Sequence, residues 1–374
     1  VEINTQHSLV FTGGQMPFSD LISIGIGNVT NFQITNSNPS LTVWDVTSPT
    51  RVSRVDANNA DGICSFIANT DSLRQFLAFD NTAYLTPVFA EKTPNQNLHG
   101  IASTDMLIVT HKDYISEANR IAEFHRQQDG LDVVIVTNEQ IYNEFSSGSP
   151  DASAIRDFAR MLYKRPSENK LKYLLLFGDG SYDYKDIHSG NTNRILTFQT
   201  LESMNSTSSY QSDDFDGLLD DNEGYDAFGL IDIGIGRFPV SNKEEAKNAV
   251  DKTIFYATNQ PESLGDWRNK ICLIADDEDG NTHLNQVEDK IVPKIESKSK
   301  AFNLEKIYLD AYKQLSVPGG QRYPDVNIAI AEQIESGALL IGYTGHGGEL
   351  SWASEGILTV REINSWTNGD KQPV

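Results

Sequence analysis

A single histidine between glycines is the residue of this chain best suited to proton transfer. His346 lies in "TGHGG", directly after the apolar run "ALLIGY". Imidazole exchanges protons near neutral pH and can serve as a general base or acid. Gly345 and Gly347 leave the backbone beside the ring open, so a substrate carbonyl could approach and an amide N–H could face a developing oxyanion. The alternative interpretation is a tight turn in which His346 has no chemical role.

A catalytic imidazole needs an acid that fixes its tautomer. Asp276 and Asp277 follow the apolar run "KICLIA", and either could supply that acid. The same two residues also fit a solvated acidic loop, so the sequence alone leaves both interpretations open.

The nucleophile of such a site is not evident from the sequence. The hydroxyl residues beside the histidine lack a nucleophile-elbow pattern; they are Thr344, Ser351 and Ser354. Of the two cysteines, Cys272 lies inside "KICLIAD", where a buried and inert thiol is expected. Cys64 is far from it in sequence, which argues against a disulfide framework or a cysteine-rich metal site.

An acidic run, "SDDFDGLLDDNEGYD" at 212–226, offers carboxylate oxygens that suit calcium. The candidate ligands are Asp220, Asp221 and Glu223. The EF-hand spacing fails because Leu219 occupies the first ligand position. A solvated loop is the alternative, and the sequence contains neither a P-loop nor an H-E-x-x-H zinc motif.

The polar clusters must be positioned by an α/β framework. From Leu107 on, apolar strands alternate with helix-period segments, which predicts a mostly parallel sheet flanked by helices. The expected strands are 106–109, 133–136, 173–177, 229–235, 271–275, 306–309 and 338–343. The expected helices are 117–128, 152–164 and one that begins at Ser241 with Glu244 completing a capping box.

Three of the expected strands release polar clusters at their carboxyl ends. These clusters are "GDGSYDYKD", "DDEDGNTH" and "TGHGG". Ligands bind beyond the carboxyl ends of parallel strands, so we expect the three clusters to meet at one edge of the sheet.

The first part of the chain has a different pattern. Short apolar runs such as "ISIGIGNV", "LTVWDV" and "RQFLAFD" alternate with Gly, Asn and Ser, which predicts an antiparallel β domain over 1–97. The polar segment "EKTPNQNLHG" reads as a linker to an α/β domain over 98–374.

Composition limits the function further. The chain has 374 residues and a net charge of −22, from 30 basic and 52 acidic residues. This charge argues against binding nucleic acid or docking on anionic lipid. The sequence contains no apolar run long enough to span a membrane and no signal-peptide pattern, and it begins at Val1, as a processed or excised piece would.

Several long segments resemble the gingipain family of cysteine peptidases. "YTGHGGELSW" followed by "ILTVREINSW" is similar to the histidine loop and next helix of that family, and "YLLLFGDGSYDYKDI" and "KICLIADDEDG" have counterparts in order. The similarity is greatest to the branch of type IX secretion C-terminal signal peptidases, the PorU-type sortases, on "VWDVTSP" and "DAYKQLSVPGGQRYPDVNIAI". It covers nearly the whole chain and implies a caspase-like, gingipain-like α/β fold after the N-terminal β domain.

The resemblance also implies roles for individual residues. His346 would be the base, Asp277 the acid that orients it, and Gly347 the donor of an oxyanion-hole N–H. The expected substrate contacts are Gly345, Trp352 and His283. An aspartate that receives the basic side chain in arginine-cleaving gingipains has no evident counterpart, since Thr282, His283 and Leu284 stand near its position.

In the family, the nucleophilic cysteine stands at the end of the strand after the next helix. Here that strand would begin at 371–374, "KQPV", so the cysteine is expected just beyond Val374.

The function implied by the resemblance is that of an endopeptidase and transpeptidase. It would remove the C-terminal sorting domain of secreted cargo and attach the cargo to surface lipopolysaccharide. Catalysis would require no cofactor, and a structural calcium ion would be compatible with the acidic run. The implied partners are a PorV-type outer-membrane β-barrel, cargo C-terminal domains and anionic lipopolysaccharide, at the cell surface and with no nucleic acid. The alternatives are a secreted gingipain-like endopeptidase and a noncatalytic binding scaffold.

Overall fold

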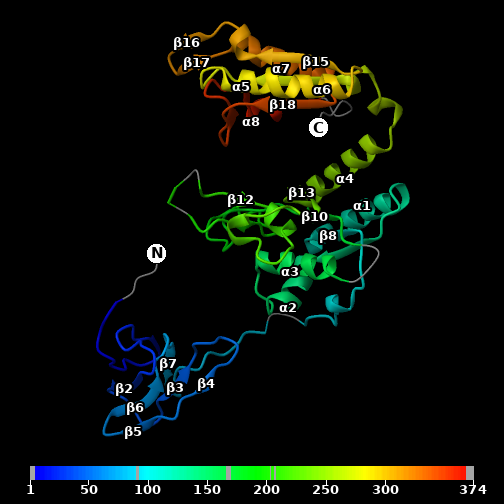
Figure 1. Ribbon diagram of the computed structural model, residues 1–374. Coiled ribbons are helices and arrows are strands. Elements are labelled where there is room, and N and C mark those ends of the chain that lie inside the picture. Colours follow the sequence, from blue (N-terminus) through cyan, green and yellow to red (C-terminus); the bar gives the residue numbers. More distant parts are fainter. Residues whose placement is uncertain (1–4, 90–91, 166–169, 203, 206–207, 368–374) are drawn as a thin grey trace. The chain divides into compact units, whose positions relative to one another are not determined.

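The computed structural model divides the chain into two compact units, 1–94 and 95–374 (Figure 1). The residues it describes are 5–89, 92–165, 170–202, 204–205 and 208–367. The division falls three residues before the expected boundary between 97 and 98, because the linker is tied to the second unit. Gln96 Nε2 donates to the Gln140 carbonyl at 2.7 Å, and the Leu98 N–H donates to Glu144 Oε1 at 2.7 Å.

The N-terminal unit consists of two antiparallel sheets, as expected. One sheet has the order β1-β7-β3-β4, with β1 Gln15–Phe18, β3 Thr42–Asp45, β4 Ser53–Arg54 and β7 Phe76–Phe79. The other has the order β2-β6-β5, with β2 Val29–Thr35, β5 Asn58–Ala60 and β6 Ile63–Asn69. Phe32, Phe66 and Phe76 pack with ring centroids 5.0–5.1 Å apart and form the core of this unit. The run "ISIGIGNV" is not a strand until Val29, and Ile26 is fully exposed.

A four-stranded parallel sheet begins the second unit. Its order is β13-β10-β8-β9, with β8 Met106–Thr110, β9 Val133–Thr137, β10 Tyr173–Phe177 and β13 Gly234–Phe238. Successive side chains of β8 point to opposite faces. Leu107 and Val109 pack with α2 Asn138–Phe145 and α3 Ala152–Tyr163. Ile108 packs with α1 Ile115–Gln128 and α4 Lys243–Ala257 on the other face.

A separate three-stranded parallel sheet follows. Its order is β15-β14-β18, with β14 Lys270–Ala275, β15 Asn303–Tyr308 and β18 Leu340–Thr344. Cys272 and Ile274 of β14 pack against α7 Pro324–Ser336. Ile271, Leu273 and Ala275 face the other way, toward the helical segment built from α5 Thr282–Asn285, the π-helical turn Gln286–Ile291 and α6 Val292–Lys298.

The expected fold class is therefore confirmed, but the parallel strands form two sheets instead of one. Among the described strands, β13 pairs only with β10, and β14 pairs with β15 and β18. Strand periodicity identifies which residues face a helix, but it carries no information on which strand lies beside which. The expectation that all three polar clusters share one edge is wrong for "GDGSYDYKD", because that cluster follows β10 in the other sheet.

Two local expectations also need correction. The strand expected at 229–235 is β13, five residues later, because the Asp232 side chain instead accepts the Leu219 N–H at 2.8 Å in the loop before it. Helix α4 begins after Asn242, whose side chain accepts the N–H groups of Glu244 and Glu245 at 3.0 Å, so the cap is one residue later than Ser241. Helix α3 begins as expected, with Asp151 as its N-cap.

The remaining strands and the last α-helix are short. They are β11 Phe198–Gln199, β12 Gln211–Ser212, β16 Leu315–Val317, β17 Gly320–Arg322, β19 Ser351–Trp352, β20 Leu358–Thr359 and α8 Val360–Ile363. The strand expected from 371 to 374 lies outside the described residues. Within the described part of the chain, no helix combines the length and apolar character that crossing a membrane requires.

Candidate active site

The site is formed where two neighbouring parallel strands end. In the register of β14 and β18, Ala275 lies opposite Thr344. The residues that follow are Asp276 on one strand, and Gly345 and His346 on the other. The carboxyl ends of parallel strands lie at the same edge of a sheet, so an acid and an imidazole about 70 positions apart in sequence become neighbours.

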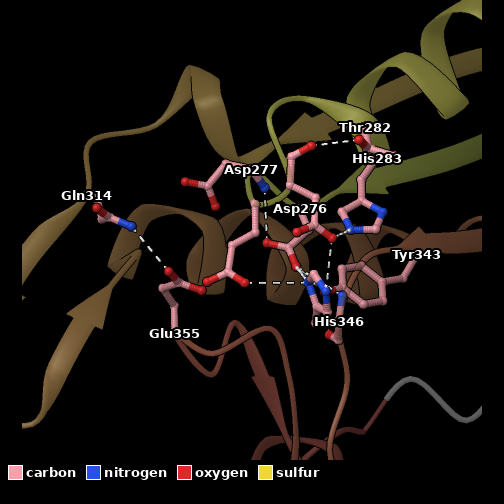
Figure 2. Close-up of polar contacts among 10 residues, drawn as sticks. Asp276, Asp277, Thr282, His283, Gln314, Tyr343, His346 and Glu355 are labelled. Carbon is pink, nitrogen blue, oxygen red and sulfur yellow. Dashed lines mark hydrogen bonds and ion pairs between the residues drawn. The ribbon is translucent and has the colours of Figure 1, made fainter.

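The backbone of His346 is fixed on both sides. Its N–H donates to Asp276 Oδ2 at 3.0 Å. Its carbonyl accepts from the Tyr343 hydroxyl at 2.7 Å, and Figure 2 shows both residues. The same carbonyl also accepts from the Ala353 N–H at 2.8 Å. A backbone held by three hydrogen bonds positions its side chain with little freedom, which is what a proton-transfer group needs.

Gly345 has a different role from the one expected of it. A Cβ at this position would lie 2.5 Å from the Asp276 Cβ and still closer to the Tyr343 hydroxyl. The space left by the missing side chain is therefore filled by the protein and not by a substrate. Gly345 lets the loop pass close enough to Asp276 for the His346 N–H to reach the carboxylate.

The imidazole of His346 is surrounded by acids. Its Nδ1 lies 3.2 Å from Asp276 Oδ2 and 3.5 Å from Glu278 Oε2, and its Nε2 lies 3.2 Å from Asp279 Oδ2. The hydrogen bond with Asp276, with further charge attraction from Asp279 and Glu278, raises the pKa of His346 above its usual value of 6.5. The side chain is 47% exposed, so the ring can meet another molecule.

Of the two acids that follow β14 directly, Asp276 contacts His346 and Asp277 does not, which corrects the role expected for Asp277. Asp276 continues β14, since its N–H donates to the Thr344 carbonyl at 3.0 Å, and its side chain points toward the histidine loop. Asp277 instead accepts a hydrogen bond from the Tyr323 hydroxyl at 2.7 Å. Consecutive side chains of an extended chain point to opposite sides, so only one of two adjacent acids can face the imidazole.

Asp276 stays ionised although it is buried. Burial alone would raise its pKa, but hydrogen bonds from the His346 N–H, the His346 ring and the Asp277 N–H outweigh burial, and the pKa of Asp276 falls below its usual value. A carboxylate that accepts several hydrogen bonds favours its charged form. Asp276 is therefore suited to hold the imidazole in one orientation and to stabilise the imidazolium form.

The other residues expected at the site have mixed placements. Gly347 pairs with Trp352 in an isolated β-bridge, and nothing lies within 4 Å of where its Cβ would be. Trp352 stacks on Tyr343 with ring centroids 4.6 Å apart and 5° between the planes, which supports the loop. The ring of His283 lies 5.0 Å from that of His346. Their contacts with a substrate, and the oxyanion role of Gly347, remain predictions.

Four residues of the site were not singled out by sequence reasoning, and two of them, Glu278 and Asp279, contact the His346 ring. Tyr343, the penultimate residue of β18, anchors the His346 carbonyl and stacks on Trp352. Glu355 is only 2% exposed, and burial together with the nearby Asp277 and Asp276 raises its pKa. A tyrosine next to the strand end is a weak signal of such a role, and Glu355 carries no evident signal at all.

Neither cysteine of the chain can act as the nucleophile here. Burial raises the pKa of Cys272 to about 12, and it also raises the pKa of Cys64. Both thiols are fully buried, which confirms the expectation of an inert thiol at Cys272.

The three calcium ligands expected in the acidic run do not lie together in the structure. Asp221 pairs with Arg160 and Lys164, so it is not available as a calcium ligand in the expected set. Asp220 and Glu223 instead lie with Asp232, their ligand oxygens within 4.8 Å of one another. The Glu223 Oε2 is buried and has no hydrogen-bond partner among the described residues. Asp232 was not expected because it lies beyond the end of the acidic run.

The acids of "GDGSYDYKD" hold their own loop. Asp179 accepts a hydrogen bond from the Thr192 hydroxyl. Asp183 accepts from the N–H groups of Ile187 and His188 at 2.9 and 2.7 Å. This cluster belongs to the four-stranded sheet and contributes no contact to His346 among the described residues.

Comparison with known proteins places these residues in a peptidase family. A family model described as "Peptidase family C25" matches residues 101–374. Gingipain R2 of Porphyromonas gingivalis is 26% identical over 268 residues, which are 72% of this chain and 31% of that protein. Gingipain R1 of the same organism is also 26% identical, with 72% of this chain and 23% of that protein covered.

A solved structure, described as dimeric latent PorU from Porphyromonas gingivalis, is similar in fold. It superposes with a TM-score of 0.57 and 35% sequence identity, over 66% of this chain and 25% of that chain. The chain thus spans about a third or less of the length of each of these relatives.

Proposed function

The chain belongs to peptidase family C25, and from this we propose that it forms part of a type IX secretion sortase, a cysteine endopeptidase and transpeptidase. Such an enzyme removes the C-terminal sorting domain of secreted cargo and attaches the cargo to surface lipopolysaccharide. The observation that carries the proposal is the His346–Asp276 pair at the carboxyl edge of a parallel sheet. The similarity to PorU, at 35% identity, favours this branch of the family.

In the proposed reaction, His346 moves the protons. It takes the thiol proton of the cysteine that we expect beyond Val374, and the thiolate attacks the carbonyl carbon of the scissile peptide. The carbon–nitrogen bond breaks, the imidazolium returns the proton to the leaving amine, and a thioester remains. An amine of the acceptor, or water, then takes the acyl group from the sulfur.

The remaining groups of the site support these steps. Asp276 holds Nδ1, so Nε2, which lies beside the exposed Asp279, is the ring nitrogen that would exchange protons with the thiol. Gly347, which has open space where a Cβ would lie, is proposed to donate its N–H to the oxyanion. Trp352 and His283 are proposed to line the substrate side of the loop.

We place the protein at the cell surface, associated with the outer membrane, where a PorV-type β-barrel and the C-terminal domains of cargo would be its partners. Anionic lipopolysaccharide would supply the acceptor amine. A calcium ion at Asp220, Glu223 and Asp232 would be structural, and catalysis would not depend on a cofactor.

A secreted gingipain-like endopeptidase is the second candidate, favoured by the similarity to gingipains R1 and R2. The position expected to receive a basic substrate side chain is close to His283, which does not attract a cation as a carboxylate would. This difference favours the sortase.

The test uses the complete protein with two substrates: casein, and a cargo protein that carries its C-terminal sorting domain. Cleavage confined to the sorting domain supports the sortase, and rapid degradation of casein after one residue type supports the endopeptidase. His346→Ala should abolish either activity, whereas His188→Ala, at an exposed histidine in the loop after β10, should not. Absence of a cysteine after Val374 in the complete protein would leave only the noncatalytic scaffold.

A further inference from the structure

His283 is an imidazole without a hydrogen-bond partner at the edge of the candidate active site. Its side chain is 15% exposed, and both ring nitrogens are buried with no hydrogen bond among the described residues. A buried polar group left unpaired is costly, and such groups in native proteins call for an explanation. The contacts of His283 point to a ligand that would satisfy it.

The loop after β14 places this ring beside His346. Asp279, Gly280 and Asn281 all have left-handed φ angles, 60°, 60° and 65°, and this sharp turn starts α5 so that His283 faces the histidine loop. Asp, Gly and Asn are the residues that adopt this conformation most readily. The rings of His283 and His346 meet at 90° with centroids 5.0 Å apart (Figure 2).

A carboxylate lies between the two imidazoles. Asp279 Oδ2 is 3.2 Å from His346 Nε2 and 3.6 Å from His283 Nε2. A tetrahedral ion with bonds of about 2.0–2.1 Å has ligand atoms about 3.4 Å apart. These two distances bracket that value, so Asp279 Oδ2 lies at ligand spacing from each of the two imidazoles.

The other ring nitrogen of His346, Nδ1, already has the carboxylate partner that a metal-binding histidine usually has. Asp276 Oδ2 contacts Nδ1 at 3.2 Å, so Nε2, which faces Asp279, is the nitrogen that would bind an ion. A metal-binding histidine usually has its other nitrogen held by a carboxylate, which fixes the tautomer and increases the basicity of the ring. One ligand atom each of Asp276, His283 and His346 lies within 4.8 Å of the other two, so the two imidazoles are close enough to share an ion.

We propose that His283, His346 and Asp279 bind a divalent transition-metal ion of the zinc class, with Asp276 orienting His346 from behind. Two imidazoles and one carboxylate suit Zn²⁺, Co²⁺ or Ni²⁺, whereas Ca²⁺ and Mg²⁺ prefer sites made of oxygen alone. The ion would occupy the lone pair of His346 Nε2. If His346 is the base of the proposed function, metal binding therefore switches the peptidase off reversibly.

Binding is tested on the chain itself, independently of any cleavage. Co²⁺ is titrated into the 374-residue chain and followed by its visible absorption, and Zn²⁺ is then added as a competitor. We expect one site of tetrahedral character, with affinity at least tenfold weaker in His283→Ala and in Asp279→Asn. His188→Ala is the matched control and should bind as the unaltered chain does. Asp276→Asn should weaken binding about 10- to 100-fold.

Two outcomes overturn the metal site: no Co²⁺ binding to the chain, or binding that is unchanged in both His283→Ala and Asp279→Asn. Asp279 is exposed, so its variant keeps the test valid if His283→Ala fails to fold. In the complete protein, Zn²⁺ should inhibit cleavage, and His283→Ala should relieve the inhibition. Metal binding through His283 without any inhibition would confirm the site and contradict the role of His346 as base.

Discussion

One carboxylate oxygen of Asp276 contacts His346 at two points, the backbone N–H at 3.0 Å and the ring Nδ1 at 3.2 Å. The first contact fixes where the loop lies, and the second fixes how the ring is turned. Both depend on Gly345, because any larger residue there would collide with Asp276. The geometry of the site therefore rests on an acid, a glycine and a histidine contributed by two adjacent strands.

Asp276→Asn should lower the pKa of His346. The carboxylate is the main cause of the raised pKa, and the amide keeps the shape of the side chain but removes its charge. The folded chain favours the imidazolium. Its contribution to the stability of the fold is therefore complete below about pH 6.5 and is lost as the pH rises through the raised pKa. The measurement is the NMR titration of the His346 ring proton. Asp277→Asn is the control, and an equal change of pKa in that variant would contradict the assignment.

Gly345→Ala should destabilise the chain by about 1–3 kcal/mol, because the added methyl group would overpack a filled site. Its Cβ would lie 2.5 Å from the Asp276 Cβ. Gly347→Ala is the matched control, since nothing lies within 4 Å of its Cβ position. The free energies of unfolding from urea titration decide between them. Equal stability of the two variants would show that the loop is not tightly packed at Gly345.

Neither thiol should react with a disulfide reagent in the native chain at pH 8. Thiolate is the reactive form, and burial raises the pKa of Cys272 to about 12 and also raises that of Cys64. We expect both thiols to react after unfolding in guanidinium, as followed by the absorbance of the released thiolate. Rapid reaction of one thiol in the native chain would mean that Cys64 or Cys272 is accessible.

Calcium should raise the thermal midpoint of the chain, and Asp232→Asn should weaken its binding. The reason is that Asp232, Asp220 and Glu223 offer clustered oxygens. Asp221→Asn should leave the affinity unchanged, because Asp221 already pairs with Arg160 and Lys164. Calorimetric titration measures both variants. Equal affinity in Asp232→Asn and the unaltered chain would argue against this set of ligands.

Asp216→Asn should stabilise the chain at pH 7. Asp216 is fully buried, both its oxygens lack a hydrogen-bond partner among the described residues, and burial raises its pKa well above 3.8. An acid whose pKa is higher in the folded state than in the unfolded state makes the folded state lose stability as pH rises above the unfolded pKa. The gain should therefore disappear near pH 3, as chemical denaturation at the two pH values will show. A gain of the same size at both values would point to packing instead of charge.

Much of the fold could be predicted from the sequence because it depends on local patterns. The alternation of apolar runs with helix-period segments predicted β8, β9, β10 and β14, and the resemblance to a peptidase family agreed with the later family match. The grouping of the strands into two sheets could not be predicted, because every buried parallel strand has the same apolar pattern whichever strand lies beside it.

For the site, the sequence by itself determined the chemistry that is available: one imidazole between glycines after a strand, and two acids after another. Only the tertiary structure decided which of the two acids contacts His346 and which other side chains lie beside its ring. The register of β14 and β18 turns Asp276 toward His346 and Asp277 away from it, and a left-handed turn brings His283 to the same ring. Residue types are local properties, whereas contacts between residues about 70 positions apart arise from strand pairing and loop direction, which no local pattern specifies.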